Sequence, residues 1–273
     1  MKKRSFIESF AAVPHSVWAL LFIIAPLIFV VYFAFTDTYG NFTLDNISLL
    51  SSYAHIFSLS VCFALIATVI CLIIGYPLAY FISQLKPSTQ KILIVLIMLP
   101  MWISLLIRTY SLMAILDNGG LLNSLLSAIG LPKAKIVGTS GAVILGMVYD
   151  FLPYMVLPIY TSIAKIDRRY FEAAQDLGCN NLRVLSNVVV PLSIPGIISG
   201  ITMVFVPSIS TFYISQKLGG GTFELIGDTI ERQFVTGALN TGAALSLVMM
   251  ILILVSLAVM NRFTDSDDGG IVV

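Results

Sequence analysis

The chain carries little charge for its length. Charged residues make up 11% of its 273 residues, whereas soluble domains usually contain about 25%. The net charge is only +1, and no basic run alternates with aromatic residues, which argues against nucleic-acid binding. This scarcity of charge excludes an ordinary soluble domain and points to a membrane environment.

Cysteine and histidine are scarce as well. The three cysteines, Cys62, Cys71 and Cys179, form no CxxC pair, so we expect neither a disulfide framework nor a zinc site. His15 and His55 lie outside the long apolar runs, and no GxSxG or HExxH motif occurs. A membrane-embedded hydrolase would need a nucleophile with a base, so it ranks last among the possible functions.

Apolar sequence, in contrast, is abundant. Hydrophobic residues make up 58% of the chain, and the mean hydropathy is +0.97. Six apolar runs each approach the ~20 residues with which a helix crosses a bilayer. They predict an all-α integral membrane protein with six transmembrane helices. The predicted spans are 17–35, 60–83, 92–116, 141–164, 188–213 and 242–260.

The first apolar run is longer than a signal-peptide core and no small-residue cleavage site follows it, so we expect a retained helix.

The connecting loops differ in their content of Lys and Arg. Basic residues are concentrated on the N-terminal side of the membrane, which predicts that both termini are cytosolic. On that side lie Lys2, Lys3, Arg4, Lys86, Lys91, Lys165, Arg168, Arg169, Arg183 and Arg262, against Lys133, Lys135, Lys217 and Arg232 on the other.

The cytosolic loop at 165–187 has helix signals of its own. Asp167 can cap a helix, and Ile166 and Phe171 are placed to form a hydrophobic staple around that cap. Gly178 suits the left-handed residue that ends a helix. These signals predict a short helix of about two turns with small residues on one face, although an ordinary solvated loop is an alternative.

At this loop the residues resemble a known family, the permeases of ABC importers. Their EAA loop reads E-A-A, three residues, G, nine residues, I, one residue, L-P, and it forms a coupling helix that docks on an ATPase subunit. Valine replaces isoleucine and leucine here, which is a conservative departure. The matching residues are Glu172, Ala173, Ala174, Gly178, Val188, Val190 and Pro191, with Tyr170 and Phe171 at the start of the helix.

The resemblance extends over nearly the whole chain. The stretches LIRTYSLMAIL, GMVYDFLPYMVLPIYTSIAKID, FEAAQDLG and VPSISTFYISQKLGG resemble the first of the two permease types in spermidine/putrescine importers. This implies a single permease domain over 1–273 with the type I (MetI-like) fold, in a bacterial inner membrane. It also implies a second homologous permease, two ATPase subunits and an external polyamine-binding protein as partners.

The chain is not expected to be an enzyme by itself or to hold a cofactor. It contains no phosphate-binding GxxxxGKS or GxxxxGKT loop, so ATP and Mg²⁺ would be bound by the partner ATPase subunits. Two alternatives are an ABC permease for another small solute and a proton-coupled secondary transporter. The latter would explain six helices and an intramembrane carboxylate, but it would not need a capped coupling helix.

Two charged residues fall within the predicted spans. Asp150 lies about nine residues into the fourth span, near the middle of a ~30 Å core. Arg108 lies near the outer boundary of the third span, where its side chain could reach the interface. Asp150 could line the substrate path and attract a cation, or it could pair with Arg108 as a structural or gating charge.

Prolines and aromatic residues also suggest a path through the membrane. We expect Pro153 and Pro158 to interrupt the fourth helix, and Pro195 and Pro207 the fifth. Broken backbone at membrane depth is tolerated where it is buried in protein or lines a cavity. Aromatic rings beside a carboxylate would suit an amine, although interfacial or packing roles are the alternative. The candidate pathway residues are Asp150, Tyr149, Tyr154, Phe212, Tyr213 and Trp102.

Smaller features complete the prediction. A turn at Asp117–Gly120 precedes an amphipathic helix at 121–129, and another short helix is expected at 223–234. The acidic end, 265–270, is expected to be a disordered tail.

Overall fold

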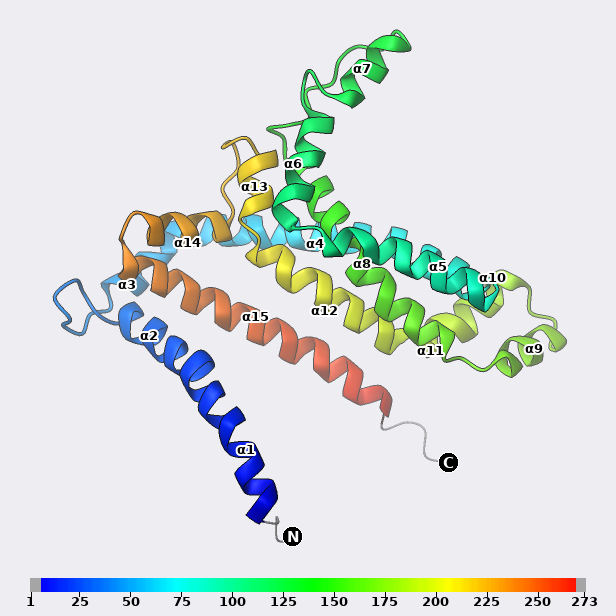
Figure 1. The fold of residues 1–273 in the computed structure, drawn as a ribbon, viewed down its shortest axis with the longest axis horizontal. Helices are drawn as coiled ribbons and strands as arrows, with labels where there is room; N and C mark the ends of the chain where they lie inside the picture. Colours follow the sequence, from blue (N-terminus) through cyan, green and yellow to red (C-terminus); the bar gives the residue numbers. More distant parts are fainter. Residues whose placement is uncertain (1–5, 269–273) are drawn as a thin grey trace. The chain divides into compact units, whose positions relative to one another are not determined.

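The computed structural model describes residues 6–268 as helices joined by short connections (Figure 1). Within that range there is no β-strand, and one isolated bridge joins Thr36 to Phe42. The predicted features at Lys2, Lys3, Arg4, Gly269 and Gly270 lie outside the described residues. The elements are α1 Phe6–Ala19, η1 Leu20–Ile24, α2 Ala25–Ala34, α3 Asp45–Ser48, α4 Leu50–Ser83, α5 Pro87–Met98, η2 Leu99–Trp102, α6 Leu105–Leu116, α7 Leu121–Ala128, α8 Ser140–Ala164, α9 Arg168–Asp176, α10 Asn181–Val184, η3 Leu185–Val189, α11 Val190–Leu192, α12 Ile194–Ser210, α13 Tyr213–Leu218, α14 Ile226–Val235 and α15 Leu239–Asp268.

Six membrane spans are present in the described chain when each bent helix pair is counted as one span. Four are long apolar segments, Val13–Ala34, Leu50–Ser83, Ser140–Ala164 and Leu239–Met260. The third and fifth spans are the bent pairs, with angles of 94° and 68° between their halves. The predicted all-α, six-span fold is therefore confirmed.

The described chain divides into two compact units, with the divisions falling inside α4, α14 and α15. Unit 1 comprises residues up to 55 and 229–252, and unit 2 comprises 56–228 and the residues from 253 onward. The expectation of a single domain stays a prediction.

Unit 1 is held together by small residues and one amide. Ala34, Ala243 and Ala244 form its buried centre, and Asn240 donates to the backbone oxygen of Thr36 at 2.6 Å. In the loop after α2, the carboxylate of Asp37 accepts the backbone N–H groups of Asn41 and Tyr39, each at 2.8 Å. The bond from Asn41 is the main reason that the pKa of Asp37 lies below its usual value.

Unit 2 is built around the close pair α8 and α12, which lie side by side in Figure 1. A Cβ added at Gly196 would lie 2.7 Å from the backbone oxygen of Pro158, and one at Gly200 would lie 2.8 Å from Sδ of Met155. Because only a hydrogen atom fits at these positions, the two helix backbones approach closely. Gly146 makes the same kind of contact with Leu218 on α13.

The helix breaks differ from those predicted. Helix α8 runs unbroken through Pro153 and Pro158, and α12 runs through Pro207, so the expected interruptions at these prolines are wrong. A proline removes one N–H donor, and the packing of α8 against α12 maintains the helices despite that loss. The fifth span breaks at Ser193, and Pro195 follows in the first turn of α12. The backbone N–H that proline lacks would have no partner within the helix at this position.

The third span is broken where no break was predicted. Helix α5 tightens into the 3₁₀ turn η2, and Ile103 is extended with φ −85° and ψ 140° before α6 begins. The chain therefore turns sharply between Trp102 and Leu105. Pro100 lies in the 3₁₀ turn η2 directly before this bend, and it is not among the prolines from which a break was predicted.

Several boundaries also differ from the predicted ones. Helices α1 and α4 begin well before the first and second apolar runs, so His15 and His55 are on membrane-spanning helices. The expected disordered tail is wrong up to Asp268, because helix α15 continues beyond the last apolar span, which ends at Met260. The short helices expected at 121–129 and 223–234 are present as α7 and α14.

Candidate functional site

Helix α9 is closed at both ends by hydrogen bonds from its own loop. Asp167 is its N-cap, with the carboxylate accepting the backbone N–H of Arg169 at 3.0 Å. At the other end, Gly178 has φ +83° and donates to Gln175 O at 2.8 Å, while Cys179 N donates to Ala174 O at 3.0 Å. This bond pattern is a Schellman motif, which needs a left-handed residue at Gly178.

The faces of α9 differ in what they contact. Ala174 is 8% exposed and belongs to the core of unit 2, whereas Glu172 and Ala173 are exposed. Tyr170 is 59% exposed at the start of the helix, and Phe171 is partly buried against the core. Ala174 therefore anchors α9, and the opposite face is free to meet another protein.

Two leucines extend that exposed face. Leu177 is 86% exposed at the C-cap of α9, and Leu182 is 75% exposed on α10. Sequence reasoning missed both, although an apolar residue between a polar helix and a capping glycine is a signal that could have identified Leu177. In the loop between the fourth and fifth spans they add an apolar contribution to a surface that is otherwise polar and charged.

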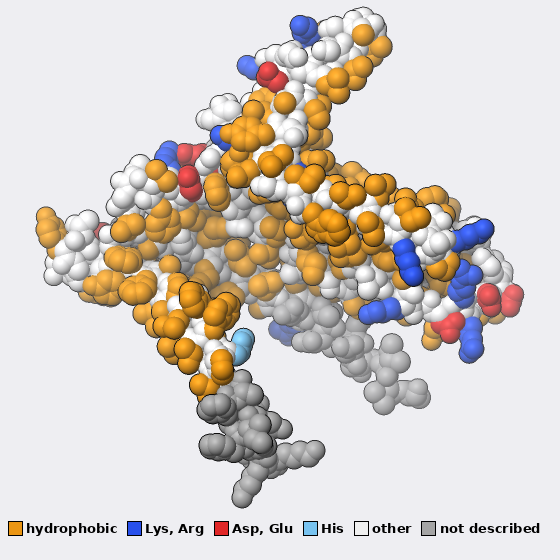
Figure 2. All heavy atoms as spheres, in the orientation of Figure 1, with side chains coloured by type: hydrophobic (Ala, Val, Ile, Leu, Met, Phe, Trp, Pro, Cys, Tyr) orange, Lys and Arg blue, Asp and Glu red, His pale blue; other side chains and the backbone are white. Residues whose placement is uncertain are grey.

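Hollows flank α9 on both sides. One, of about 710 Å³, lies between α9, α10 and the ends of α4 and α8, and its lining includes Gln84, Gln90 and Glu172. Another of about 710 Å³ runs between α8 and α12 up to Tyr170. Figure 2 shows Lys and Arg side chains gathered around the end of unit 2 that carries α5, α9 and α10.

Gln90 and Ser193 fix the elements around this end, and sequence reasoning missed both. The Gln90 amide donates to Ser83 O at 2.9 Å and Leu85 O at 2.8 Å, and its oxygen accepts from Tyr160 on α8 at 2.9 Å. The buried Ser193 hydroxyl, at the break in the fifth span, lies 3.0 Å from Tyr76 Oη on α4. Polar residues at a helix break are the signal that could have indicated Ser193.

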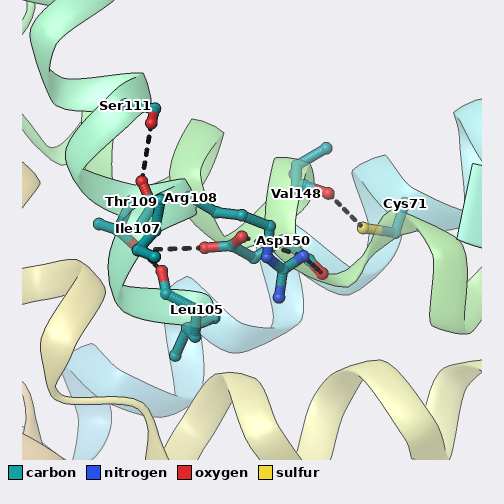
Figure 3. Close-up of polar contacts among 8 residues, drawn as sticks. All are labelled: Cys71, Leu105, Ile107, Arg108, Thr109, Ser111, Val148 and Asp150. Atoms are coloured by element: carbon teal, nitrogen blue, oxygen red, sulfur yellow. Dashed lines mark hydrogen bonds and ion pairs between the residues drawn. The ribbon is translucent and has the colours of Figure 1, made fainter. Parts of the chain in front are cut away.

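The two intramembrane charges meet inside unit 2 (Figure 3). Arg108 Nη1 on α6 lies 3.2 Å from Asp150 Oδ1 on α8, with the two side chains 6% and 0% exposed. The same nitrogen lies 3.3 Å from the backbone oxygen of Asp150. Thr109 Oγ1 is 3.2 Å from Asp150 Oδ2 and 2.9 Å from Leu105 O. Its hydroxyl has one proton to donate to these two acceptors.

This ion pair is close but not well hydrogen-bonded. Asp150 Oδ1 and Arg108 Nε are buried without a hydrogen-bond partner among the described residues. The attraction between the charges therefore depends on their proximity and on the low polarity around them. Of the two arrangements left open by the sequence, the structure contains the pair, and a pathway role for Asp150 stays a prediction.

The predicted pathway aromatics are not gathered into one cluster. Trp102 is 76% exposed in the turn of the third span, and Tyr149 and Phe212 are 43% and 41% exposed. Tyr154 is half-buried and packs edge-on against Phe151, with ring centroids 6.3 Å apart. Tyr213 instead meets Tyr110 on α6. Their role as pathway residues stays a prediction.

The described chain is a multi-span helical protein with a capped, exposed helix between its fourth and fifth spans. Residues 72–266 match the family described as the binding-protein-dependent transport system inner membrane component. The chain belongs to this family of inner-membrane permeases of ABC importers. It is therefore a multi-pass membrane subunit that works with a substrate-binding protein.

Similar proteins agree with this assignment. The chain is 36% identical over 256 residues to the spermidine/putrescine transport system permease protein PotB of Haemophilus influenzae, covering 90% of each chain. It is 37% identical to PotB of Escherichia coli, covering 87% of this chain and 92% of that one. A bacterial ABC transporter that imports alginate has the same fold, with a TM-score of 0.79, 18% identity and coverage of 96% and 97%.

Proposed function

We propose that this chain forms half of the translocation pathway of an ATP-driven importer for polyamines of the spermidine/putrescine type. The substrate proposal rests on the relatives reported above, which are named for spermidine and putrescine. The complete importer would contain a second homologous permease, two ATPase subunits that bind ATP and Mg²⁺, and an external polyamine-binding protein. Both termini and α9 would lie in the cytosol, in agreement with the basic residues around α9.

The observation that supports coupling through α9 is its combination of rigid ends and exposed surface. The Asp167 cap and the Schellman motif at Gly178 define the helix, and Ala174 holds it against the permease core. The surface that we propose for ATPase docking comprises Tyr170, Phe171, Glu172, Ala173, Leu177 and Leu182. Closure of the ATPase subunits on ATP would then move α9 and change the access of the pathway.

For the intramembrane residues we propose two roles. Arg108 and Asp150 would hold α6 against α8, because neither charge has significant exposure. The pathway would be lined by aromatic side chains, including Tyr149, Tyr154, Phe212, Tyr213 and Trp102. In an importer that must release its cargo, rings attract an ammonium group without neutralising its charge.

Reconstitution of the purified complex tests this function. We expect the chain to co-purify with a second permease and an ATPase, and spermidine-loaded binding protein to stimulate ATP hydrolysis and uptake into proteoliposomes. Stimulation by another solute, with none by spermidine or putrescine, would refute the substrate. Uptake by this chain alone without ATP would instead indicate a secondary transporter and refute the importer.

A further inference from the structure

Two tyrosine rings from different helices meet at one lysine in unit 2. The ring centroids of Tyr110 on α6 and Tyr213 on α13 are 5.8 Å apart at an interplanar angle of 77°. The ammonium of Lys217 lies 5.2 Å from the Tyr110 centroid and 5.6 Å from the Tyr213 centroid. Both distances are within the ~6 Å over which a cation interacts favourably with a ring face.

The lysine has these rings in place of a counter-ion. Among the residues whose side chains the structure describes, no carboxylate forms an ion pair with Lys217. Tyr110 is 46% exposed, and Lys217 is partly exposed. The two rings therefore form an accessible site that a primary ammonium group of the protein already occupies.

We propose that Tyr110 and Tyr213 form a binding site for a primary ammonium group of the transported amine, and that Lys217 occupies it as a tethered competitor until substrate displaces it. This deepens the proposed function and rests on it. The ammonium of Lys217 and the end of a linear polyamine have the same chemistry, a cation on a flexible methylene chain.

The tether gives the site a useful property for transport. A cation–ring contact is weak enough to break, so an arriving amine can displace Lys217 and later be displaced by it. The returning lysine would favour release of the amine. Loss of the lysine charge should therefore strengthen binding of the amine, whereas loss of a ring should weaken it.

A double-mutant experiment in the reconstituted importer separates the two uses of the rings. In Lys217→Gln the contact with the lysine is already absent, so a ring can affect uptake through the substrate or through its packing on the other ring, and a comparison at equal complex assembly excludes the packing effect. In that background we expect Tyr110→Leu to take up radiolabelled spermidine about fivefold more slowly than the ring-keeping control Tyr110→Phe, at equal complex assembly. Equal rates for the Leu and Phe variants would overturn the proposal.

The lysine itself supplies a second measurement, which does not depend on removing a ring. At sub-saturating spermidine, Lys217→Gln should take up several-fold more than the matched variant Lys217→Arg, which keeps a cation over the rings. Equal uptake by the two would overturn the role of Lys217 as a competitor. Wild-type complex that fails to import spermidine would refute the proposed function instead, so the two failures can be told apart.

Discussion

Removing the charge of Asp150 should destabilise the protein severely. Asp150→Asn keeps the shape of the side chain but leaves the guanidinium of Arg108 buried without a counter-charge. Both side chains are almost fully buried, at 6% exposure for Arg108 and 0% for Asp150. Loss of one partner from such a pair costs about 3–5 kcal/mol, because the remaining charge has lost its compensation.

The surrounding contacts place the expected loss at the lower end of that range. The backbone oxygen of Asp150 remains 3.3 Å from Arg108 Nη1, so the cation keeps one acceptor in the variant. We therefore expect about 3 kcal/mol from the asparagine substitution alone. In the double variant with Arg108→Gln no charge is buried, and most of the lost stability should return.

The free energy of unfolding in mixed detergent micelles measures this prediction. Arg169→Gln is the matched control, because it removes the cation from an exposed pair whose atoms are 3.8 Å apart, and it should change stability by less than about 1 kcal/mol. An Asp150→Asn variant with wild-type stability but impaired uptake would refute the structural pair and favour a substrate role. A failure of Arg108→Gln to restore the stability of Asp150→Asn would also refute the structural pair.

Three other predictions follow from the described contacts. Gly178→Val should lower ATP-driven uptake because φ is +83°, whereas Gly178→Asn should retain more of it; equal rates in proteoliposomes would contradict the Schellman role. Glu172→Lys should weaken co-purification of the ATPase without changing membrane insertion. Normal recovery of the ATPase would exclude Glu172 from the docking surface. Gly196→Val should prevent tight packing of α8 on α12, because even a Cβ would lie 2.5 Å from Ser162 Cβ; a complex that elutes and melts like wild type would contradict this.

Much of the fold could be predicted from the sequence because long apolar runs have few alternatives in a bilayer. Asp167 and Gly178 were likewise recognisable, since each satisfies a local backbone requirement at a helix end. The breaks were predicted less well. Pro153 lies in a continuous helix while the third span turns near Pro100, because the effect of a proline depends on the packing around it.

The site could be predicted only in part from the sequence, for the same reason. Glu172 and its neighbours carry a pattern with fixed spacing, whereas the partner of Asp150 is far away in the chain. The predicted depth of Asp150 in the membrane was compatible both with a pairing with Arg108 and with a pathway role. The meeting of Lys217 with Tyr110 had no sequence signal, since it depends on how α13 packs against α6.

The glycine contacts between α8 and α12 have a mechanical consequence for the proposed coupling through α9. Helix α9 is connected to α8 on one side and, through α10, η3 and α11, to α12 on the other. Because α8 and α12 pack backbone to backbone at Gly196 and Gly200, they resist sliding past one another. In the proposed importer, a force applied at α9 would therefore tilt α8 and α12 together as one rigid pair.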